Sequence, residues 1–356
     1  MGFSTAFRAV NIINGGIWMK KAMVSLFALA LCFCSVGAFA DPPKVGMCIY
    51  KFDDTFMSYV RNTVETLAKG NLDLSTQDSQ FDQPKQNDQI DQFLTQGVKS
   101  LAINMVDPSA ANVLIQKTAK KKVPLILFNR EPGDIDLAKY PNVYYVGAKA
   151  QESGTMQGQI VAKYWKAHPE ADLNKDGVLS YVMLMGDPSN SDAKFRTQYS
   201  IEAVKAAGIK VKELAEDTAM WDRPKAQEKM AAWLAAFPGQ IDVVFANNDD
   251  MALGAIEALK AAGYFKGGKY MPVVGVDATP PAKDALKQGE LLGTVLNDAN
   301  GQGTATYELA ASLAAGKPAK TTVAKFSNKD GKADPKGHYV WVPYQMVTKD
   351  NVDSFK

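Results

Sequence analysis

The chain has 356 residues, three cysteines and a formal net charge of +2. Its 46% hydrophobic and 22% charged residues are an ordinary globular mixture, which excludes a collagen-like repeat and wholesale disorder. The length favours two domains over one, and the near-neutral charge gives no support for electrostatic binding of nucleic acid.

The N-terminal segment has the pattern of a secretory signal peptide. Met19-Lys20-Lys21 precedes a mostly apolar run from Ala22 to Phe33, and Ala38-Phe39-Ala40 supplies small residues at the −3 and −1 positions. We therefore predict that residues 1–40 are a signal peptide cleaved after Ala40. Residues 1–18 suit an n-region poorly, so translation starting at Met19 is the alternative to Met1. A membrane anchor is disfavoured because the apolar core is shorter than the ~20 residues of a membrane span.

Cleavage would change both the charge and the cysteine count. It removes three basic residues and no acidic one, so the net charge falls from +2 to −1. Cys32 and Cys34 leave with the signal, and Cys48 remains alone, so no intrachain disulfide is possible. Because Cys48 lies inside an apolar run, we expect it to be a buried structural thiol.

The remainder of the chain alternates short apolar runs with amphipathic stretches. Helical spacing is clear in Val60, Val64, Leu67 and Ala68, for example. Several runs are apolar on successive residues, as expected for strands covered on both faces. Alternating βα units predict parallel, doubly wound sheets of the α/β class. About ten strands suit two sheets better than one. The predicted strands are Val45–Tyr50, Leu72–Ser75, Ser100–Asn104, Pro124–Phe128, Tyr144–Val146, Ser180–Met185, Ile209–Leu214, Val243–Ala246, Val273–Val276 and Gly293–Leu296.

Polar residues follow many of these strands, at the end of an α/β sheet where ligands bind. They are mainly carboxylates and carboxamides, with the aromatic residues Phe56 and Trp221 and the cation Arg196 nearby. Such a set suits a neutral polyhydroxyl ligand, since each hydroxyl both donates and accepts and flat rings cover its C–H faces. The alternative for each Asp or Asn taken singly is a turn or helix cap. The polar residues considered are Asp53, Asp54, Asn104, Asp107, Asp187, Asn190, Asp192, Asn247, Asn248, Asp249, Asp250, Asp277, Asn297 and Asp298.

At these residues the sequence resembles the periplasmic galactose/glucose-binding proteins, the type I sugar-binding proteins of bacterial ABC importers. The resemblance runs from about Lys44 to about Asn351. It is carried together by Tyr50–Met57, Gln86–Ile90, Leu101–Pro108, Asp217–Asp222, Ala246–Asp249 and Gly293–Asn300.

The resemblance implies two Rossmann-like lobes joined by a three-segment hinge, the type I periplasmic binding protein fold. The N-terminal lobe would comprise residues 41–147 and 298–335, and the C-terminal lobe residues 148–297 and 336–356. The hinge segments are expected near Val146–Ala150, Asn297–Asn300 and Asp334–Gly337.

The resemblance also implies the ligand contacts. Phe56 and Trp221 would sandwich a pyranose ring. Asn190 stands where the family usually has histidine, and it can still hydrogen-bond a hydroxyl. The residues expected to hydrogen-bond the sugar are Asp54, Asn104, Asp192, Arg196, Asn248, Asp277 and Asn297, with Asn190 beside them.

A second site is indicated at Asp172–Ser180. Oxygen side chains at positions 1, 3, 5 and 9 and a glycine at position 6 fit the first part of a calcium loop, while Met183 stands where an EF-hand has glutamate. The alternative is a surface turn without metal. The resemblance supplies Asp242 as the closing carboxylate. The expected ligand set is Asp172, Asn174, Asp176, the Val178 carbonyl, Ser180 and Asp242.

The expected function is reversible binding of galactose or glucose in the periplasm, without turnover. The resemblance implies delivery to an ABC permease and, in some relatives, to a chemotaxis receptor. We expect a monomer that binds no nucleic acid. A different monosaccharide is the alternative ligand. A glycosidase using Asp54 and Asp277 is the enzyme alternative. A repressor-type effector domain is disfavoured because a signal peptide stands in place of an N-terminal DNA-binding helix pair.

Overall fold

The computed structural model describes residues 1–2, 41–327 and 337–355, and residues 42–356 form one compact unit. The predicted signal peptide lies almost entirely outside the described residues. None of the described helices combines the length and the apolar character needed to cross a membrane.

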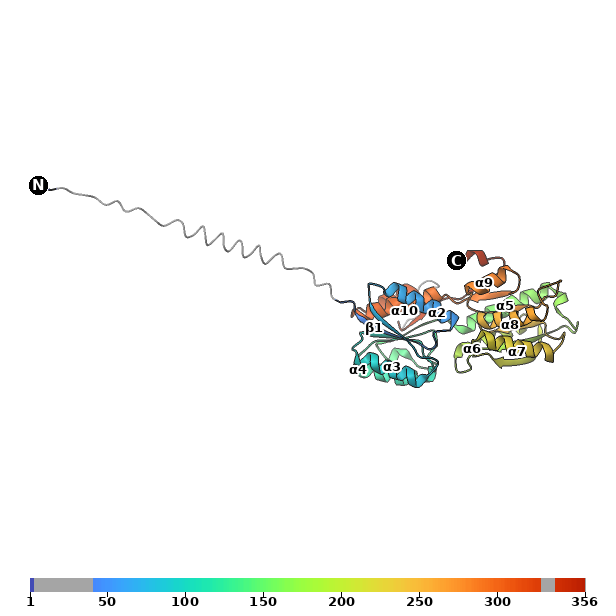
Figure 1. Cartoon of the computed structure of the whole chain (residues 1–356), viewed down its shortest axis with the longest axis horizontal. Helices are drawn as coiled ribbons and strands as arrows, with labels where there is room; N and C mark the ends of the chain where they lie inside the picture. Colours follow the sequence, from blue (N-terminus) through green and yellow to red (C-terminus); the bar gives the residue numbers. More distant parts are fainter. Residues whose placement is uncertain (3–40, 328–336, 356) are drawn as a thin grey trace. The chain divides into compact units, whose positions relative to one another are not determined.

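The first lobe is built on a sheet whose described strands run in the order β2-β1-β3-β4-β5-β11, all paired in parallel. Figure 1 shows α2 and α10 on one side of this sheet and α3 and α4 on the other. The strands are β1 Lys44–Ile49, β2 Asp73–Asp78, β3 Ser100–Ile103, β4 Leu125–Phe128, β5 Val143–Gly147 and β11 Tyr339–Trp341. The helices are α2 Thr55–Ala68, α3 Gln83–Thr95, α4 Ala111–Lys121, α10 Ala299–Ala314 and α11 Ala319–Ser327.

The second lobe repeats this arrangement in the order β7-β6-β8-β9-β10-β12, with β12 antiparallel to β10. Residues of α5 and α6 share a core with one face of the sheet, and residues of α7, α8 and α9 share a core with the other. The strands are β6 Val178–Met185, β7 Lys210–Thr218, β8 Val243–Ala246, β9 Val273–Val274, β10 Gly293–Leu296 and β12 Gln345–Thr348. The helices are α5 Ala150–Ala167, α6 Ser191–Ala206, α7 Arg223–Ala236, α8 Asp249–Ala261 and α9 Pro280–Lys287.

Burial on both faces explains the continuous apolar strands. Along β1, Val45, Met47 and Ile49 enter the core beneath α2 and α10, whereas Cys48 enters the opposite core beneath α3 and α4. Side chains alternate between the two faces of a strand, so a strand covered on both sides must be apolar at every position. The predicted parallel α/β architecture with two sheets is confirmed.

The described backbone crosses between the sheets at three places. Ala148–Lys149 follow β5, Asn297–Asp298 follow β10, and Val342–Tyr344 join β11 to β12. The first two crossings lie where the sequence predicts hinge segments.

The third crossing corrects the expected boundary at residue 335/336. Tyr339–Trp341 pairs with β5 in the first sheet, so the first lobe extends to Trp341 and only the residues beyond it enter the second lobe. Aromatic packing stabilises this pairing at the sheet edge, where the ring centroids of Trp341 and Tyr145 lie 5.4 Å apart. Of the hinge segment expected at Asp334–Gly337, residues 334–336 lie outside the described part of the chain.

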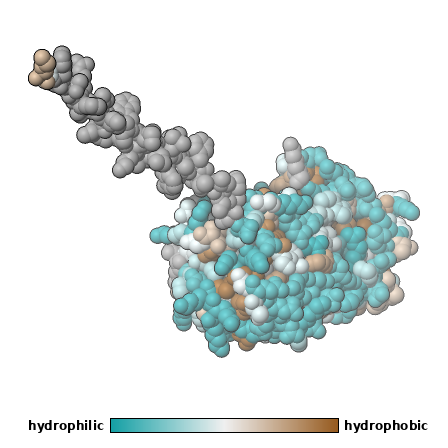
Figure 2. All heavy atoms as spheres, turned by 60° about the vertical axis from the view of Figure 1, so that its left-hand side comes forward, coloured by the Kyte–Doolittle hydropathy of each residue, from teal (hydrophilic) through white to brown (hydrophobic). Residues whose placement is uncertain are grey.

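The visible surface is mostly hydrophilic, with hydrophobic residues in small separate areas (Figure 2). Within the described part of residues 42–356, the exposed large hydrophobic side chains are Phe81, Val113 and Leu173. These are scattered residues, which are normal on a protein surface. The expectation of a monomer stays a prediction.

Cys48 provides a test of the first core. Its side chain is fully buried, and burial raises the pKa of its thiol to about 12. In protein cleaved after Ala40, we expect a thiol reagent at pH 8 to label Cys48 more than about a hundredfold more slowly in native buffer than in denaturant. Rapid labelling of native protein would show that this core opens readily. Uncleaved chain is the control, because denaturant should then expose three thiols.

Candidate functional site

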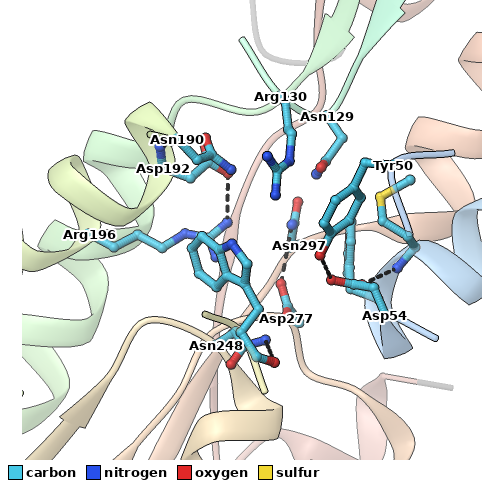
Figure 3. Close-up of a pocket in the computed structure, with 13 residues that line it drawn as sticks. Tyr50, Asp54, Asn129, Arg130, Asn190, Asp192, Arg196, Asn248, Asp277 and Asn297 are labelled. Carbon is cyan, nitrogen blue, oxygen red and sulfur yellow. Dashed lines mark hydrogen bonds and ion pairs between the residues drawn. The ribbon is translucent and has the colours of Figure 1, made fainter. Parts of the chain in front are cut away.

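A pocket of about 340 Å³, counting space open to solvent, lies between the carboxyl ends of the two sheets (Figure 3). Both lobes contribute to its wall. The lining residues are Tyr50, Asp54, Phe56, Met57, Asn129 and Arg130 from the first lobe, and Asn190, Asp192, Arg196, Trp221, Asn248, Asp277 and Asn297 from the second lobe and its crossing segment.

Asp54 is held in place by the start of α2. Its Oδ1 accepts a hydrogen bond from the Met57 backbone N–H at 2.7 Å, so Asp54 caps the helix. Its Oδ2 accepts from the Tyr50 hydroxyl at 2.5 Å. Burial raises the pKa of Asp54, while these hydrogen bonds and the charge of Arg130 partly oppose the rise. The helix-capping role and the pocket-lining role therefore belong to the same carboxylate.

Asn104 corrects one sequence-based expectation. Its side chain is fully buried and lies behind the pocket wall, where Oδ1 accepts from the Tyr50 backbone N–H at 3.2 Å and Nδ2 donates to the Phe128 carbonyl at 3.2 Å. It thus joins the ends of β1, β3 and β4. Asn104 therefore does not line the pocket, and its polar atoms hold neighbouring strand ends together.

Asn129 lines the pocket in the place expected for Asn104. It follows β4, its Oδ1 accepts from Asn104 Nδ2 at 3.3 Å, and its backbone has a positive φ of 64°. Asparagine tolerates this left-handed conformation better than most residues. The next residue, Arg130, is buried against the Tyr50 ring, with its Cζ 4.0 Å from the ring centroid.

The start of α6 supplies three wall residues of the second lobe. Asn190 caps the helix through Oδ1, which accepts from the Asp192 N–H at 3.0 Å, so its Nδ2 is the group that remains to donate to a ligand. Arg196 lies one turn after Asp192, and its Nη2 donates to Asp192 Oδ2 at 3.1 Å. Burial raises the pKa of Asp192, and the charges of Arg196 and Arg130 oppose the rise.

Arg196 is held from several sides. Its Nη1 donates to the Asn247 carbonyl at 2.9 Å, and its Nη2 also donates to the Tyr344 hydroxyl at 3.1 Å. Tyr344 belongs to the third crossing segment. The Nε of Arg196 is buried and has no hydrogen-bond partner among the described residues. A donor of this kind in a pocket wall is available to a ligand oxygen.

Three further amide and carboxylate side chains complete the polar wall. Asn248 caps α8 through Oδ1, which accepts from the Met251 N–H at 2.9 Å. Asp277 Oδ1 accepts from Asn297 Nδ2 at 3.2 Å. Burial raises the pKa of Asp277 well above its ordinary value; the Arg196 charge opposes this shift, and Asp249 adds to it.

Aromatic side chains reach the pocket from both lobes. Phe56 is the second residue of α2, and Trp221 lies in the loop between β7 and α7. Trp221 has a φ of 66°, an uncommon backbone conformation for a bulky residue. Its ring lies against Gly186, where a Cβ atom would come within 2.2 Å of the indole. The absence of a side chain at Gly186 therefore makes room for this ring.

The pocket combines nearly balanced charge with many hydrogen-bonding groups. Three acidic side chains, Asp54, Asp192 and Asp277, face two guanidinium groups from Arg130 and Arg196. Carboxylates accept, guanidinium groups donate, and the asparagines do both. Such a wall suits a neutral ligand with several hydroxyl groups. The uncommon φ values of Asn129, Trp221 and Asp277 are a feature that clusters at functional sites.

Nine of the ten expected ligand contacts lie in the pocket wall, Asn104 being the exception. Sequence reasoning missed Tyr50, Met57, Asn129 and Arg130. The signal for two of these was available, because Asn129 and Arg130 come directly after the predicted strand Pro124–Phe128. Inspecting that strand end as the others were inspected would have identified both.

The segment expected to bind calcium, Asp172–Ser180, begins with a turn closed by its own side chains. Asp172 Oδ2 accepts from the Gly177 N–H at 2.8 Å, and Asp176 Oδ1 accepts from the Val178 N–H at 2.8 Å. Asn174 Oδ1 likewise accepts from the Asp176 N–H at 3.1 Å. The other oxygen of Asp172 is buried and finds no hydrogen-bond partner within the described structure. This arrangement leaves an acceptor oxygen for a cation.

Asp242 lies next to this loop but is engaged by the backbone. Its two oxygens accept from the N–H groups of Leu173 at 3.2 Å and of Ser180 at 2.8 Å. Burial raises the pKa of Asp242 to about 6; the two N–H bonds lower it in part, and the charges of Asp172 and Asp176 add to the rise. In the described part of the chain, no three Asp, Glu, His or Cys side chains form a cluster that could hold a metal. The oxygen donors of the loop are of the kind that calcium prefers, whereas both oxygens of Asp242 accept hydrogen bonds from the backbone.

Comparisons with known proteins agree with this geometry. Residues 45–318 match the family described as "Periplasmic binding protein domain". The chain is 45% identical over 340 residues to the D-galactose/methyl-galactoside binding periplasmic protein MglB of Haemophilus influenzae, which covers 94% of this chain and 99% of the relative. It is 31% identical to the xylitol-binding protein of Mycolicibacterium smegmatis, over 93% of this chain and 85% of that protein.

Solved structures show the same fold. An ABC transporter solute binding protein from Bacillus halodurans with bound myo-inositol aligns with a TM-score of 0.73 and 27% identity, covering 88% of this chain and 96% of that one. A Mycobacterium smegmatis protein in complex with β-D-fucofuranose aligns with a TM-score of 0.73 and 26% identity, covering 88% and 93%. The chain thus has the fold of these binding proteins and belongs to the periplasmic binding protein family.

Proposed function

We propose that this protein binds a monosaccharide, galactose or glucose, between its two lobes and delivers it to an ABC importer in the cytoplasmic membrane. The observation that carries the proposal is the polar wall of the pocket, in which both lobes contribute carboxylates, carboxamides and a guanidinium. A phosphorylated or carboxylated ligand would add negative charge to a wall that already has three carboxylates against two guanidinium groups. A neutral polyol satisfies donors and acceptors together without adding charge.

The similarity to the Haemophilus influenzae protein, nearly end to end, supports galactose as the first ligand to test. Relatives with less similarity have other polyols in their names, among them xylitol, so a different monosaccharide is the alternative. Asn190 supplies an uncharged amide donor to whichever hydroxyl it faces. The family consists of binding proteins, so we expect reversible binding without turnover.

The transport role requires an exported protein. We propose a periplasmic location after removal of residues 1–40, because the relative with the highest identity quoted above is named as periplasmic. We also propose a monomer, which the scattered exposed hydrophobic residues favour. A chemotaxis receptor is a second partner to test by direct binding.

The ligand can be identified by titration with sugars while tryptophan emission is followed, since Trp221 lies in the pocket wall. We expect saturable binding of galactose or glucose, with weaker responses to ribose and arabinose. Calorimetry with xylitol and myo-inositol extends the panel. Saturation by ribose or a polyol without a response to either hexose would contradict the hexose assignment. An aryl galactoside should release no phenol, and release of phenol would support a glycosidase.

The fit of Trp221 against Gly186 gives a second prediction. Gly186→Ala would place a methyl group where the indole lies, so the ring must shift. We expect the affinity for sugar to fall about fivefold, since stacking of a ring on a flat partner contributes about 1 kcal/mol.

The control is the same glycine change in a Trp221→Ala background. If Gly186→Ala acts through the indole, it should cost little further affinity once the indole is absent. An equal loss of affinity in both backgrounds would show that the methyl group disturbs the site in another way.

We also propose that calcium binds at the loop Asp172–Ser180. The donors would be the side chains of Asp172, Asn174, Asp176 and Ser180, the Val178 carbonyl, and Asp242 after a small shift from its backbone partners. The support is the buried, unpartnered oxygen of Asp172 and the Asp-x-Asn-x-Asp-Gly spacing. The role would be structural, because the loop leads directly into β6.

Thermal melting tests the calcium proposal. We expect 1 mM calcium to raise Tm by at least about 3 °C over chelator-treated protein, because a ligand that binds only the folded state stabilises it. Magnesium at the same concentration should have less effect. Asp172→Asn should abolish the shift, whereas Asp222→Asn, at a helix cap outside the loop, should retain it. The calcium proposal would be refuted if calcium did not change the Tm of the wild-type protein and the purified protein contained no metal.

A further inference from the structure

Two contacts fix which end of the Asn297 side-chain amide faces the pocket. Its Nδ2 donates to Asp277 Oδ1 at 3.2 Å, as drawn in Figure 3, and its Oδ1 accepts from Gln302 Nε2 at 2.7 Å. Asn297 lines the pocket, whereas Gln302 is not one of the lining residues. Gln302 therefore contacts a pocket side chain from behind the wall.

The position of Gln302 is set by α10. This helix begins directly after Asp298, whose Oδ1 accepts from the Gly301 N–H at 2.8 Å and whose carbonyl accepts from the Gln302 N–H at 2.9 Å. Gln302 is only 1% exposed. Close packing leaves a buried side chain few rotamers, so the Gln302 amide is held at a fixed place next to Asn297.

The direction of these hydrogen bonds follows from the carboxylate of Asp277. An ionised carboxylate only accepts, so Asn297 must direct Nδ2 toward it, and Asn297 Oδ1 then requires a donor on the other side. Gln302 supplies this donor through Nε2. The hydrogen bonds therefore all run in one direction, from Gln302 through Asn297 to Asp277.

The other end of the Gln302 amide indicates that this residue does more than fill space. Its Oε1 is buried and lacks a hydrogen-bond partner among the described residues, and Oγ1 of Thr306, one turn further along α10, lacks one too. A buried polar atom without a partner lowers stability. An apolar residue of similar volume would avoid this cost, so packing alone does not explain a glutamine at this position.

We propose that Gln302 is a positioning residue that holds the Asn297 amide with its Nδ2 toward the pocket. The inference rests on the proposed binding of a sugar there, and it concerns a residue that does not touch the sugar. In this orientation the pocket offers a donor, Asn297 Nδ2, beside an acceptor, Asp277. A hydroxyl group both donates and accepts, so one sugar hydroxyl can bond to both. The flipped amide would offer two acceptors to a hydroxyl that has one proton to donate.

Gln302→Glu distinguishes orientation of the amide from packing, because it replaces the amide by a carboxyl group of nearly the same shape. An ionised carboxylate cannot donate, so it draws Asn297 Nδ2 away from the pocket. A protonated carboxyl group can donate to Asn297 Oδ1 as the glutamine does. The loss of affinity relative to wild type should thus be larger at pH 8 than at pH 5.

The wild-type protein, measured at both pH values, accounts for the charged groups already present around this chain of hydrogen bonds. These are Asp277, the groups Arg196, Asp249 and Asp54, whose charges act on it, and Asp298 at the start of α10.

A second variant and a second background complete the design. Gln302→Met removes the donor and lets the Asn297 amide turn either way. Asp277→Asn gives a background that tolerates either orientation, because the introduced amide both donates and accepts.

Gln157→Met is the matched control. Gln157 is a buried glutamine of α5 whose Oε1 also lacks a partner in the described structure. Its Nε2 donates to backbone carbonyls instead of a pocket side chain, those of Ala246 at 2.7 Å and Val274 at 3.2 Å. Thr306→Val is the control on α10 itself, because it removes a buried hydroxyl without touching Asn297.

The test measures the dissociation constant for galactose, or for whichever sugar of the panel the wild-type protein binds, by calorimetry at pH 5 and pH 8. We expect Gln302→Glu to weaken binding at least about tenfold at pH 8 and less at pH 5, and Gln302→Met to weaken it about threefold to fivefold at both. In the Asp277→Asn background, Gln302→Glu should weaken binding by less than about threefold. Gln157→Met and Thr306→Val should stay within about twofold of wild type. Circular dichroism melting checks that each variant folds, and Gln302→Met carries the test if Gln302→Glu does not fold.

The outcomes separate this inference from the proposed function. Wild-type protein that binds no sugar would overturn both. Sugar binding by wild type with both Gln302 variants within twofold would overturn the inference alone. A loss for Gln302→Glu that is equal at both pH values and in both backgrounds would refute orientation of the amide. An equal loss for Gln157→Met would assign the effect to the packing of buried glutamines in general.

Discussion

Removal of polar groups from water between the two lobes is the constraint on which this structure depends. A buried charge or amide is tolerated only if it is hydrogen-bonded or paired. Most polar groups of the pocket wall meet this requirement within the protein: Asp54 caps a helix, Asp277 accepts from Asn297, and Arg196 contacts Asp192, Asn247 and Tyr344. These bonds orient the wall in advance. Two buried donors without a partner among the described residues, Nη2 of Arg130 and Nε of Arg196, belong to residues that line the pocket.

The hinge and the site are parts of the same network. Asn297 lines the pocket and lies in the second crossing segment, and Tyr344 of the third crossing segment accepts from Arg196. A change at the pocket can thus reach the crossing segments without passing through either core. The cores need only be rigid, and their continuous apolar strands, covered on both faces, provide that.

The same helix starts carry capping and recognition. Asp54, Asn190 and Asn248 each use one oxygen to cap the helix that follows a strand. The sequence left open whether such residues are only helix caps. At these positions the same side chain both caps a helix and lines the pocket. Capping fixes the side chain, and the remaining atoms of that side chain line the pocket. Asn104 has a structural role instead, because the oxygen and the nitrogen of its amide are both hydrogen-bonded to neighbouring strand ends.

The sequence by itself determined the parallel two-sheet architecture and most of the pocket wall. It could do so because apolar runs and the residues that follow them are local features, and because parallel strands bring their carboxyl ends to one edge of a sheet. Only the tertiary structure decided that Asn129 lines the pocket and Asn104 does not, since that choice depends on the neighbours of each strand end. It also decided that Tyr339–Trp341 belongs to the first sheet, because edge pairing with β5 is a contact between residues almost two hundred positions apart. The ion pair of Arg130 after β4 with Asp187 after β6, whose atoms Nη1 and Oδ2 lie 3.0 Å apart, was likewise inaccessible to sequence reasoning: it exists only where two lobes meet, and no spacing along the chain encodes that meeting.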